Sequence, residues 1–122
     1  MARILIAEDD LDIAENLVAL LAAKGHRAVS ASDGAEALAR ARKELPDLIL
    51  LDVMMPRMSG HDVCRMLRAD PKTAKLKIIM VTGLGRGGDV EEAFASGADD
   101  YLIKPFDTER LFKKIEKVLA LP

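Results

Sequence analysis

Six polar side chains that could work together on a phosphoryl group or a metal ion each stand at the end of a short apolar run. They are Glu8, Asp9, Asp10, Asp52, Thr82 and Lys104. A carboxylate at the end of a buried strand is costly to desolvate unless a nearby group compensates it, and packed carboxylates repel one another. A hard divalent cation would offset the desolvation cost and reduce the repulsion between the carboxylates. Mg²⁺ is such a cation, and its preferred ligands are carboxylates, a carbonyl oxygen, waters and a phosphate oxygen.

Such a set has the parts for phosphoryl transfer. With the cation in place, Asp52 could attack phosphorus as a nucleophile and form an aspartyl phosphate. Thr82 could donate a hydrogen bond to one phosphoryl oxygen, and Lys104 could neutralise another as a point charge. Taken singly, each residue has an ordinary explanation as a helix cap, a turn residue, a strand-end hydroxyl or a surface lysine. Their joint placement favours the chemical interpretation.

The apolar runs predict the strands that must position these groups. Strands are expected over residues 3–7, 26–31, 48–51, 77–81 and 100–103. The run at 48–51 is of the kind that is buried on both faces of a parallel sheet, so Asp52 is expected as the first residue to leave the sheet. The run at 26–31 is less apolar and is expected nearer an edge.

Apolar residues at helical spacing follow each of these strands. In the first such segment they are Ile13, Leu17, Leu20 and Leu21. Either Asp10 or Asp12 is expected to cap this helix, and Asp12 with Glu15 resembles a capping box. Five repetitions of strand and helix imply a parallel sheet with helices on both faces. Ligands of such sheets bind outside the carboxyl ends of the strands, where the six polar side chains would meet.

Length and composition describe an ordinary single domain. The 122 residues carry a net charge of -2, half of them are hydrophobic and 3% are aromatic. Neither a nucleic-acid surface nor a platform for stacking bases is indicated. The apolar stretch before Glu8 is too short for a signal peptide or a membrane span, so the cytoplasm is the expected location.

Cysteine and histidine offer little further chemistry. Cys64 is the one cysteine, so no intrachain disulfide can form. It lies in the apolar stripe of the expected third helix, and we expect it to be a small buried hydrophobe. His26 and His61 show no metal-ligand spacing and are expected at the surface.

Taken in order, these motifs resemble the receiver domain of two-component response regulators. The motifs are Glu8-Asp9-Asp10, Asp52 with Pro56 and Gly60 behind it, Thr82, Lys104-Pro105 and the segment from Gly97 to Phe106. The resemblance covers the whole chain, residues 1–122. It implies a flavodoxin-like, doubly wound parallel sheet of five strands in the order 2-1-3-4-5, with five helices, in a single α/β domain.

The resemblance also implies a phosphorylation site. Asp52 would be the phosphate acceptor, and the donor would be a histidine kinase or a histidine phosphotransfer protein. Asp9 would be the direct Mg²⁺ ligand, with Glu8 acting through water. Asp52 and the backbone carbonyl of Met54 would complete the protein ligands. The family acts as a signalling switch and not as an enzyme with an external substrate.

Further roles are implied on the fourth and fifth strands. Thr82 and Lys104 would bind the phosphoryl group, and the bond from Lys104 to Pro105 would be cis. Tyr101 resembles the switch aromatic, whose ring moves with Thr82; the alternative is an ordinary half-buried strand tyrosine. Phosphorylation would bias a surface made of the fourth helix, fifth strand and fifth helix, which a downstream protein or effector domain reads.

Several positions near the site depart from the family pattern. Met54 and Leu84 lie two residues beyond Asp52 and Thr82, and neither side chain can hydrogen-bond an attacking water. We therefore predict slow loss of the phosphate. Four glycines between residues 83 and 88 predict a mobile loop and a late start of the fourth helix.

The expected signalling surface departs from the pattern as well. Receivers that dimerise through it usually carry a basic residue where this chain has Val90 and an acidic residue where it has Arg110. The usual intermolecular ion pairs are therefore incomplete. A monomer or a weak, phosphorylation-dependent dimer is expected, without direct contact to nucleic acid or membrane.

Three other interpretations fit parts of the sequence. A Mg²⁺-dependent phosphohydrolase would also use Asp52 as nucleophile, but hydrolases of the haloacid-dehalogenase type carry a second acid two residues on, where this chain has Met54. A pure interaction module would not need the complete set of acidic and phosphoryl-binding groups. Residues 83–88 fit the dinucleotide pattern G-x-G-x-x-G, but they follow the fourth strand, and the next strand ends at Lys104 instead of an acid.

Overall fold

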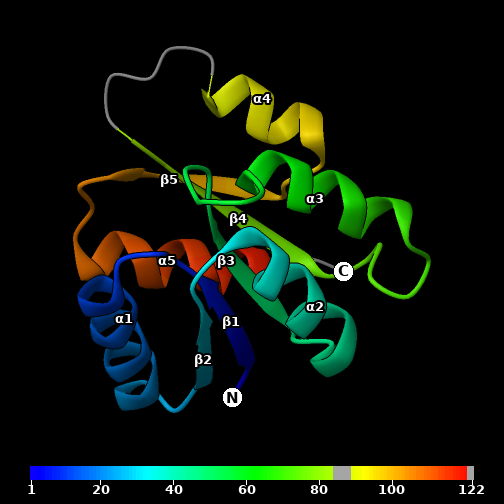
Figure 1. Ribbon diagram of the computed structural model, residues 1–122. Helices are drawn as coiled ribbons and strands as arrows, with labels where there is room; N and C mark the ends of the chain where they lie inside the picture. The colour runs from blue at the N-terminus through cyan, green and yellow to red at the C-terminus, as the bar shows by residue number, and fades with distance from the viewer. Residues whose placement is uncertain (84–88, 121–122) are drawn as a thin grey trace.

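Strands and helices alternate along the part of the chain that the computed structural model describes, residues 1–83 and 89–120 (Figure 1). The elements are β1 (Arg3–Ala7), α1 (Leu11–Ala23), β2 (Arg27–Ala31), α2 (Gly34–Glu44), β3 (Leu48–Asp52), α3 (Gly60–Ala69), β4 (Lys77–Gly83), α4 (Asp89–Ser96), β5 (Asp100–Lys104) and α5 (Thr108–Leu119). None of the helices in these described ranges is long and apolar enough to cross a membrane.

The strands form one parallel sheet in the order β2-β1-β3-β4-β5. This confirms the expected order and places β2, the least apolar strand, at an edge. Because all strands run the same way, their carboxyl ends meet at one side of the sheet. That side carries the polar groups noted in the sequence.

Three of those groups lie inside the strands, and not after them as expected. Asp52 pairs with Val81, and Thr82 pairs with Ile103, so the ladder continues through both positions. Lys104 is the last residue of β5 and pairs with Gly83. A polar residue does not end a strand while its backbone can still pair, and this is why the apolar runs understated the strand lengths.

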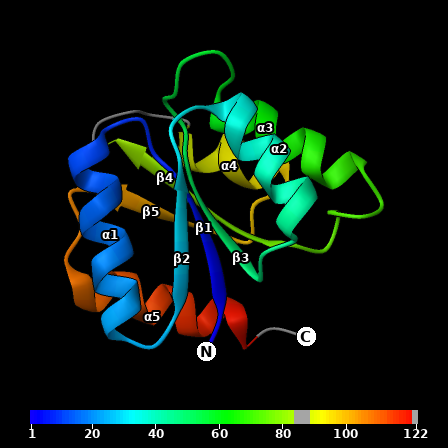
Figure 2. The same ribbon diagram turned by 60° about the horizontal axis from the view of Figure 1, so that its bottom comes forward.

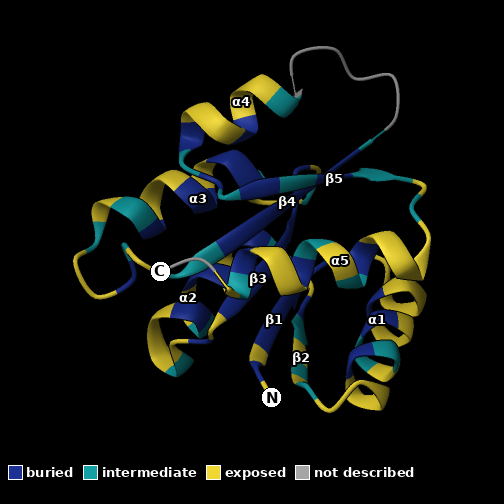
Figure 3. Cartoon of the chain, turned by 180° about the vertical axis from the view of Figure 1, so that it is seen from behind, coloured by how far each residue is buried: buried dark blue, intermediate teal, exposed yellow. Residues whose placement is uncertain are grey.

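Two hydrophobic cores hold the helices to opposite faces of the sheet, as Figure 2 shows. One core joins alternate strand residues to α2, α3 and α4: Leu5, Ile49, Leu51, Ile78 and Met80 meet Leu38, Val63, Leu67 and Ala93. The other joins the remaining strand residues to α1 and α5: Ile4, Ile6, Leu48, Leu50 and Ile79 meet Leu17, Leu21, Leu111 and Ile115. The strands are thus buried on both faces, and the exposed residues lie on the outer sides of the helices (Figure 3).

The start of α1 differs from the expected capping box. Asp10 is the N-cap, and its carboxylate accepts hydrogen bonds from the N–H groups of Asp12 and Ile13 at 3.0 and 3.2 Å. Asp12 therefore lies within the first turn. The helix begins earlier because Asp10 already has the extended backbone of an N-cap. With this starting point, the side of the helix that faces the sheet carries Ala14, Leu17 and Leu21, and Ile13 is left 38% exposed.

Cys64 is buried as expected, and burial raises the pKa of its thiol. The expectation that both histidines lie at the surface is wrong. His61 is only 5% exposed because the first turn of α3 packs beneath α4, where Glu92 approaches its ring at 3.7 Å. His26 is half-buried, and its Nδ1 accepts a hydrogen bond from the Ala2 N–H at 3.1 Å.

The mobile loop that the glycines at 83–88 predict cannot be compared with the structure over residues 84–88, Leu84 included, because these lie outside the described ranges.

Candidate functional site

Three carboxylates from two strands converge at the carboxyl edge of the sheet. Glu8 and Asp9 follow β1, Asp52 ends the neighbouring β3, and one oxygen from each carboxylate lies within 4.8 Å of the others. Glu8 and Asp52 are buried, whereas Asp9 is exposed. The sequence expectation that these acids meet is confirmed by their positions.

Lys104 supplies the charge that the two buried acids require. Its Nζ lies 3.0 Å from Glu8 Oε1 and 3.1 Å from Asp52 Oδ2. Burial by itself would lower the pKa of Lys104, but the hydrogen bonds that it donates to Glu8 and Asp52 and the negative charge of Asp52 outweigh burial, so the pKa lies above its usual value. The lysine is therefore held as an ammonium between two carboxylates.

The backbone around Asp52 fixes its carboxylate. The N–H of Met54 donates to Asp52 Oδ1 at 3.2 Å, and the N–H of Gly60 donates to the Val53 carbonyl at 2.9 Å. A side chain at Gly60 would collide with the Asp52 carbonyl, so this close approach of α3 to β3 requires glycine.

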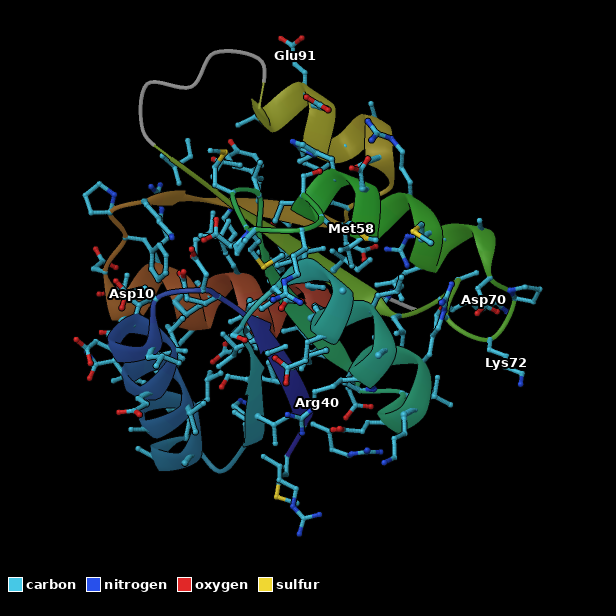
Figure 4. All side chains as sticks on the ribbon, viewed as in Figure 1. Asp10, Arg40, Met58, Asp70, Lys72 and Glu91 are labelled. Atoms are coloured by element: carbon cyan, nitrogen blue, oxygen red, sulfur yellow. The ribbon has the colours of Figure 1, made fainter. Side chains whose placement is uncertain are left out.

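The loop from β3 to α3 is also held from the side of α2. A side chain at Gly34, at the start of α2, would collide with the carbonyl of Met58, which Figure 4 labels in this loop. Arg57, at a positive φ of 73°, lies 3.7 Å from the Asp33 carboxylate, the N-cap of α2. The loop that leaves the site is thus braced by two helices.

The acid cluster suits a hard cation. The pKa of Asp9 is raised, first by desolvation and then by its hydrogen bond with Glu8, so its charged form is disfavoured at this point. Lys104 reaches Glu8 and Asp52, and Asp9 stands on the open side. Oxygen donors in such a cluster are what Mg²⁺ prefers.

The other expected site residues lie nearby on β4 and β5. Thr82 is 1% exposed in β4, which lies between the strands of Asp52 and Lys104. The Lys104–Pro105 bond is cis, the geometry that the resemblance implies. Tyr101 is half-buried on β5, and its ring contacts Phe94 of α4 and Lys114 of α5.

An apolar cavity of about 500 Å³ opens beside the acids, and the sequence did not predict it. Its walls include Ile13 and Leu17 of α1 and Phe106 after β5, while Glu8, Asp52 and Lys104 lie along it. The available signal was the apolar stripe that contains Ile13. The structure shows that part of this stripe faces the site.

Comparison with known proteins agrees with this fold and site. A family model of the response regulator receiver domain matches residues 4–116. The DNA-binding dual master transcriptional regulator RpaA of Synechocystis sp. is 42% identical over 119 residues, which make up 98% of this chain and 49% of RpaA. This chain therefore spans about half the length of that relative.

Solved receiver structures superpose closely on this chain. The chemotaxis response regulator CheY4 of Vibrio cholerae gives a TM-score of 0.90 at 34% identity, covering 97% of this chain and 98% of CheY4. The receiver domain of the sensor histidine kinase PA1611 from Pseudomonas aeruginosa gives a TM-score of 0.90 at 29% identity, covering 98% of each chain. That structure holds a magnesium ion coordinated in its active-site cleft.

The chain belongs to the response regulator receiver family. It is a receiver domain of a two-component system, a signalling module and not a catalytic one. Its acidic pocket of Glu8, Asp9 and Asp52 is consistent with a Mg²⁺-dependent phosphorylation site.

Proposed function

We propose that this domain accepts a phosphoryl group on Asp52 from the phosphohistidine of a histidine kinase or a histidine phosphotransfer protein. The observation that carries the proposal is the bridging of Lys104 between Asp52 and Glu8, at 3.1 and 3.0 Å, beside the exposed Asp9. The bridge aims the Lys104 ammonium at the proposed acceptor. The acceptor carboxylate also receives a hydrogen bond from the N–H of Met54.

The transfer needs few groups from the protein. An oxygen of Asp52 attacks phosphorus, the bond from phosphorus to the donor imidazole nitrogen breaks, and the imidazole keeps the electron pair and takes a proton. Lys104 exchanges one carboxylate partner for a phosphoryl oxygen, and the Thr82 hydroxyl donates to another. Both residues stay within their strands, so only side chains must move.

The residues present fit Mg²⁺. Asp9, Asp52 and the backbone carbonyl of Met54 would hold it directly, and Glu8 would act through a water. When bound, the ion would neutralise charge on the phosphoryl oxygens. The magnesium in the PA1611 receiver supports this choice of metal.

The cavity beside the acids suits a protein donor. A phosphohistidine that reaches Asp52 brings its neighbouring side chains over the mouth of the site. That mouth is apolar: Ile13 of α1 and Phe106 line the cavity, and Ile13 is exposed. We propose that apolar side chains beside the donor histidine cover this rim. The cytoplasm is the proposed location, because such a donor is charged from ATP.

The signal would leave through α4, β5 and α5. Thr82 and Tyr101 lie on the adjacent strands β4 and β5, so a shift of Thr82 toward a phosphoryl group can be followed by the ring of Tyr101. A downstream protein or effector domain would read the resulting surface. Glu91 points outward from α4 (Figure 4), and Arg110 is exposed on α5. Monomers, or dimers that form weakly on phosphorylation, are proposed.

The proposed domain extends over residues 1–122. The family match ends at residue 116, but Val118 is 1% exposed in the α5 core, and Ala2 is buried before β1. The Ala2 carbonyl also accepts the Arg27 N–H at 2.8 Å and so extends the sheet contact. Ala2 and Val118, which lie outside the matched segment, are thus buried together with the rest of the domain, and this supports the proposed extent.

Intact mass after incubation with Mg²⁺ and acetyl phosphate tests the phosphorylation. The wild-type chain should gain one phosphoryl group, and the gain should be lost with chelator or in Asp52→Asn. A phosphorylated histidine phosphotransfer domain tests the rim: Ile13→Lys should slow transfer from that domain and leave phosphorylation by acetyl phosphate unchanged. Equal rates of protein transfer in wild type and Ile13→Lys would contradict the proposed donor contact.

A further inference from the structure

The ring of Tyr101 is held from both sides by the helices that flank β5. On the α4 side, the rings of Phe94 and Tyr101 meet edge to face, with their centroids 5.7 Å apart and their planes at 86°. On the α5 side, Nζ of Lys114 stands 4.4 Å from the ring centroid. Figure 1 shows α4 and α5 on either side of β5. The favourable edge and cation contacts thus act on one aromatic ring.

Lys114 is itself fixed by a buried acid. Asp100 is 5% exposed, and its Oδ1 lies 3.0 Å from Lys114 Nζ. The same oxygen accepts the N–H of Tyr101 at 2.8 Å. The ammonium, the carboxylate and the backbone and ring of Tyr101 therefore form a closed cycle between β5 and α5.

The remaining charges near Asp100 are weaker candidates for this role. Nζ of Lys117 is 3.8 Å from Asp100 Oδ2, beyond hydrogen-bond distance, and its side chain is 72% exposed. Among the residues that the structure describes, Asp100 Oδ2 has no hydrogen-bond partner. Lys114 therefore supplies the main positive charge that balances the Asp100 carboxylate, and this ion pair fixes the position of the Lys114 ammonium.

We propose that Lys114 is a positioning residue of the switch: it holds the Tyr101 ring in the resting state and so sets how readily the α4–β5–α5 surface responds to phosphorylation. The inference rests on the proposed function, in which Tyr101 moves with Thr82. A contact made only in the resting state opposes the change of state by its own free energy. Neutralising Lys114 therefore shifts the unphosphorylated domain toward the activated arrangement.

The sequence provides a clean probe of this ring. Tyr101 is the one tyrosine, and the chain has no tryptophan. Tyrosine fluorescence, or the ¹⁹F signal of incorporated 3-fluorotyrosine, therefore reports Tyr101 alone. The reference values are those of the resting wild type and of the wild type with Mg²⁺ and beryllium fluoride, a phosphoryl analogue.

Three variants separate the proposal from a general loss of charge. Lys114→Met keeps the aliphatic stem and removes the cation. Lys114→Arg keeps a cation that can pair with the carboxylate and stack on the ring. Lys113→Met removes a neighbouring charge whose side chain is 76% exposed and pairs with Glu109.

In the resting state, the Tyr101 signal of Lys114→Met should move toward that of the beryllium fluoride complex. The beryllium fluoride concentration for the half-maximal signal should fall about threefold to tenfold, the factor that one cation–π contact supplies. Lys114→Arg should restore both values, and Lys113→Met should leave both unchanged. A structural role alone would lower stability without moving the resting signal toward the activated one.

Other outcomes would overturn the inference. They are an unchanged resting signal in Lys114→Met, the same shift in Lys113→Met, or no rescue by Lys114→Arg. If the wild type does not respond to beryllium fluoride, the proposed phosphorylation fails at that point. The activated reference is then missing, and the inference falls with it. Failure in Lys114→Met alone leaves the proposed phosphorylation intact.

Discussion

Lys104 Nζ lies 3.1 Å from Asp52 Oδ2, although the two residues end strands that are separated in the sheet by β4. The lysine side chain crosses the carboxyl end of β4, where Thr82 stands, to reach the acid. Asp52 of β3 and Lys104 of β5 thus meet across the carboxyl end of β4, the strand that carries Thr82. The same lysine also pairs with Glu8, so it compensates two buried charges at once.

Removing that ammonium should destabilise the metal-free domain. In Lys104→Met, Glu8 and Asp52 stay buried without a cation, and we expect the free energy of unfolding to fall by about 1–3 kcal/mol, less than for a fully buried pair because the lysine is partly exposed. Mg²⁺ should recover most of this loss. Urea denaturation with and without Mg²⁺ measures both values. An equal loss in the two conditions would show that the lysine does not compensate the metal-binding acids.

The exposed acid of the cluster should have the opposite effect. The raised pKa of Asp9 means that its charged form is disfavoured in the folded state. Asp9→Asn should therefore raise the free energy of unfolding of the metal-free domain by ~0.5 kcal/mol, which corresponds to a melting temperature higher by about 2 °C. A raised pKa makes the wild type regain this stability as the pH falls below that pKa, so the difference should vanish in acid. Mg²⁺ should stabilise the wild type and not the variant. A variant stabilised by Mg²⁺ as strongly as the wild type would exclude Asp9 as a ligand.

Phosphate lifetime offers a test at Met54. Its side chain is 54% exposed two residues beyond Asp52, and a thioether cannot orient an attacking water. Met54→Asn should speed loss of the phosphate about 10-fold or more, in the range of a positioned polar group. Met66→Asn, at another exposed methionine, is the control and should leave the rate unchanged. Decay of the phosphorylated mass with time measures it, and equal rates in all three chains would contradict the role of position 54.

A structural cluster away from the site should affect stability alone. The guanidinium of Arg68 donates to the carbonyls of Gly97, Ala74 and Leu76 and to the carboxylate of Asp99. A lysine cannot make this fan of hydrogen bonds, so Arg68→Lys should lower the free energy of unfolding by about 1–3 kcal/mol. Stabilisation by Mg²⁺ should not change. Arg65→Lys, an exposed counterpart, should stay within ~0.5 kcal/mol of wild type.

The periodicity of apolar residues was enough to predict the alternation of strands and helices, because each element buries a continuous stripe. The positions of Asp52 and Lys104 at strand ends were enough to predict that they meet. Neither pattern shows at which residue a helix begins, and therefore which of its side chains turn toward the sheet. For this reason the sequence favours Asp12 with Glu15 as a capping box, whereas Asp10 is the N-cap, and it does not show that Ile13 lies beside the site.

Tertiary contacts explain the other differences. His61 is polar, but α4 covers it. Because α4 begins 28 residues after His61, the residues next to His61 in the sequence do not indicate this packing. The apolar cavity likewise forms from α1 and the segment after β5, which are far apart in the chain. The pairing of Lys114 with both Asp100 and the Tyr101 ring depends on side-chain directions that the sequence pattern does not encode.

The measurement that tests the central claim most directly is the position of the phosphoryl group. After incubation with Mg²⁺ and acetyl phosphate, borohydride reduces an aspartyl phosphate to homoserine, and peptide mass spectrometry locates the change. We predict homoserine at position 52, in the peptide that contains Leu48–Asp52, and none when acetyl phosphate is left out. Homoserine at Asp9 or at another acid, with Asp52 unchanged, would contradict the account.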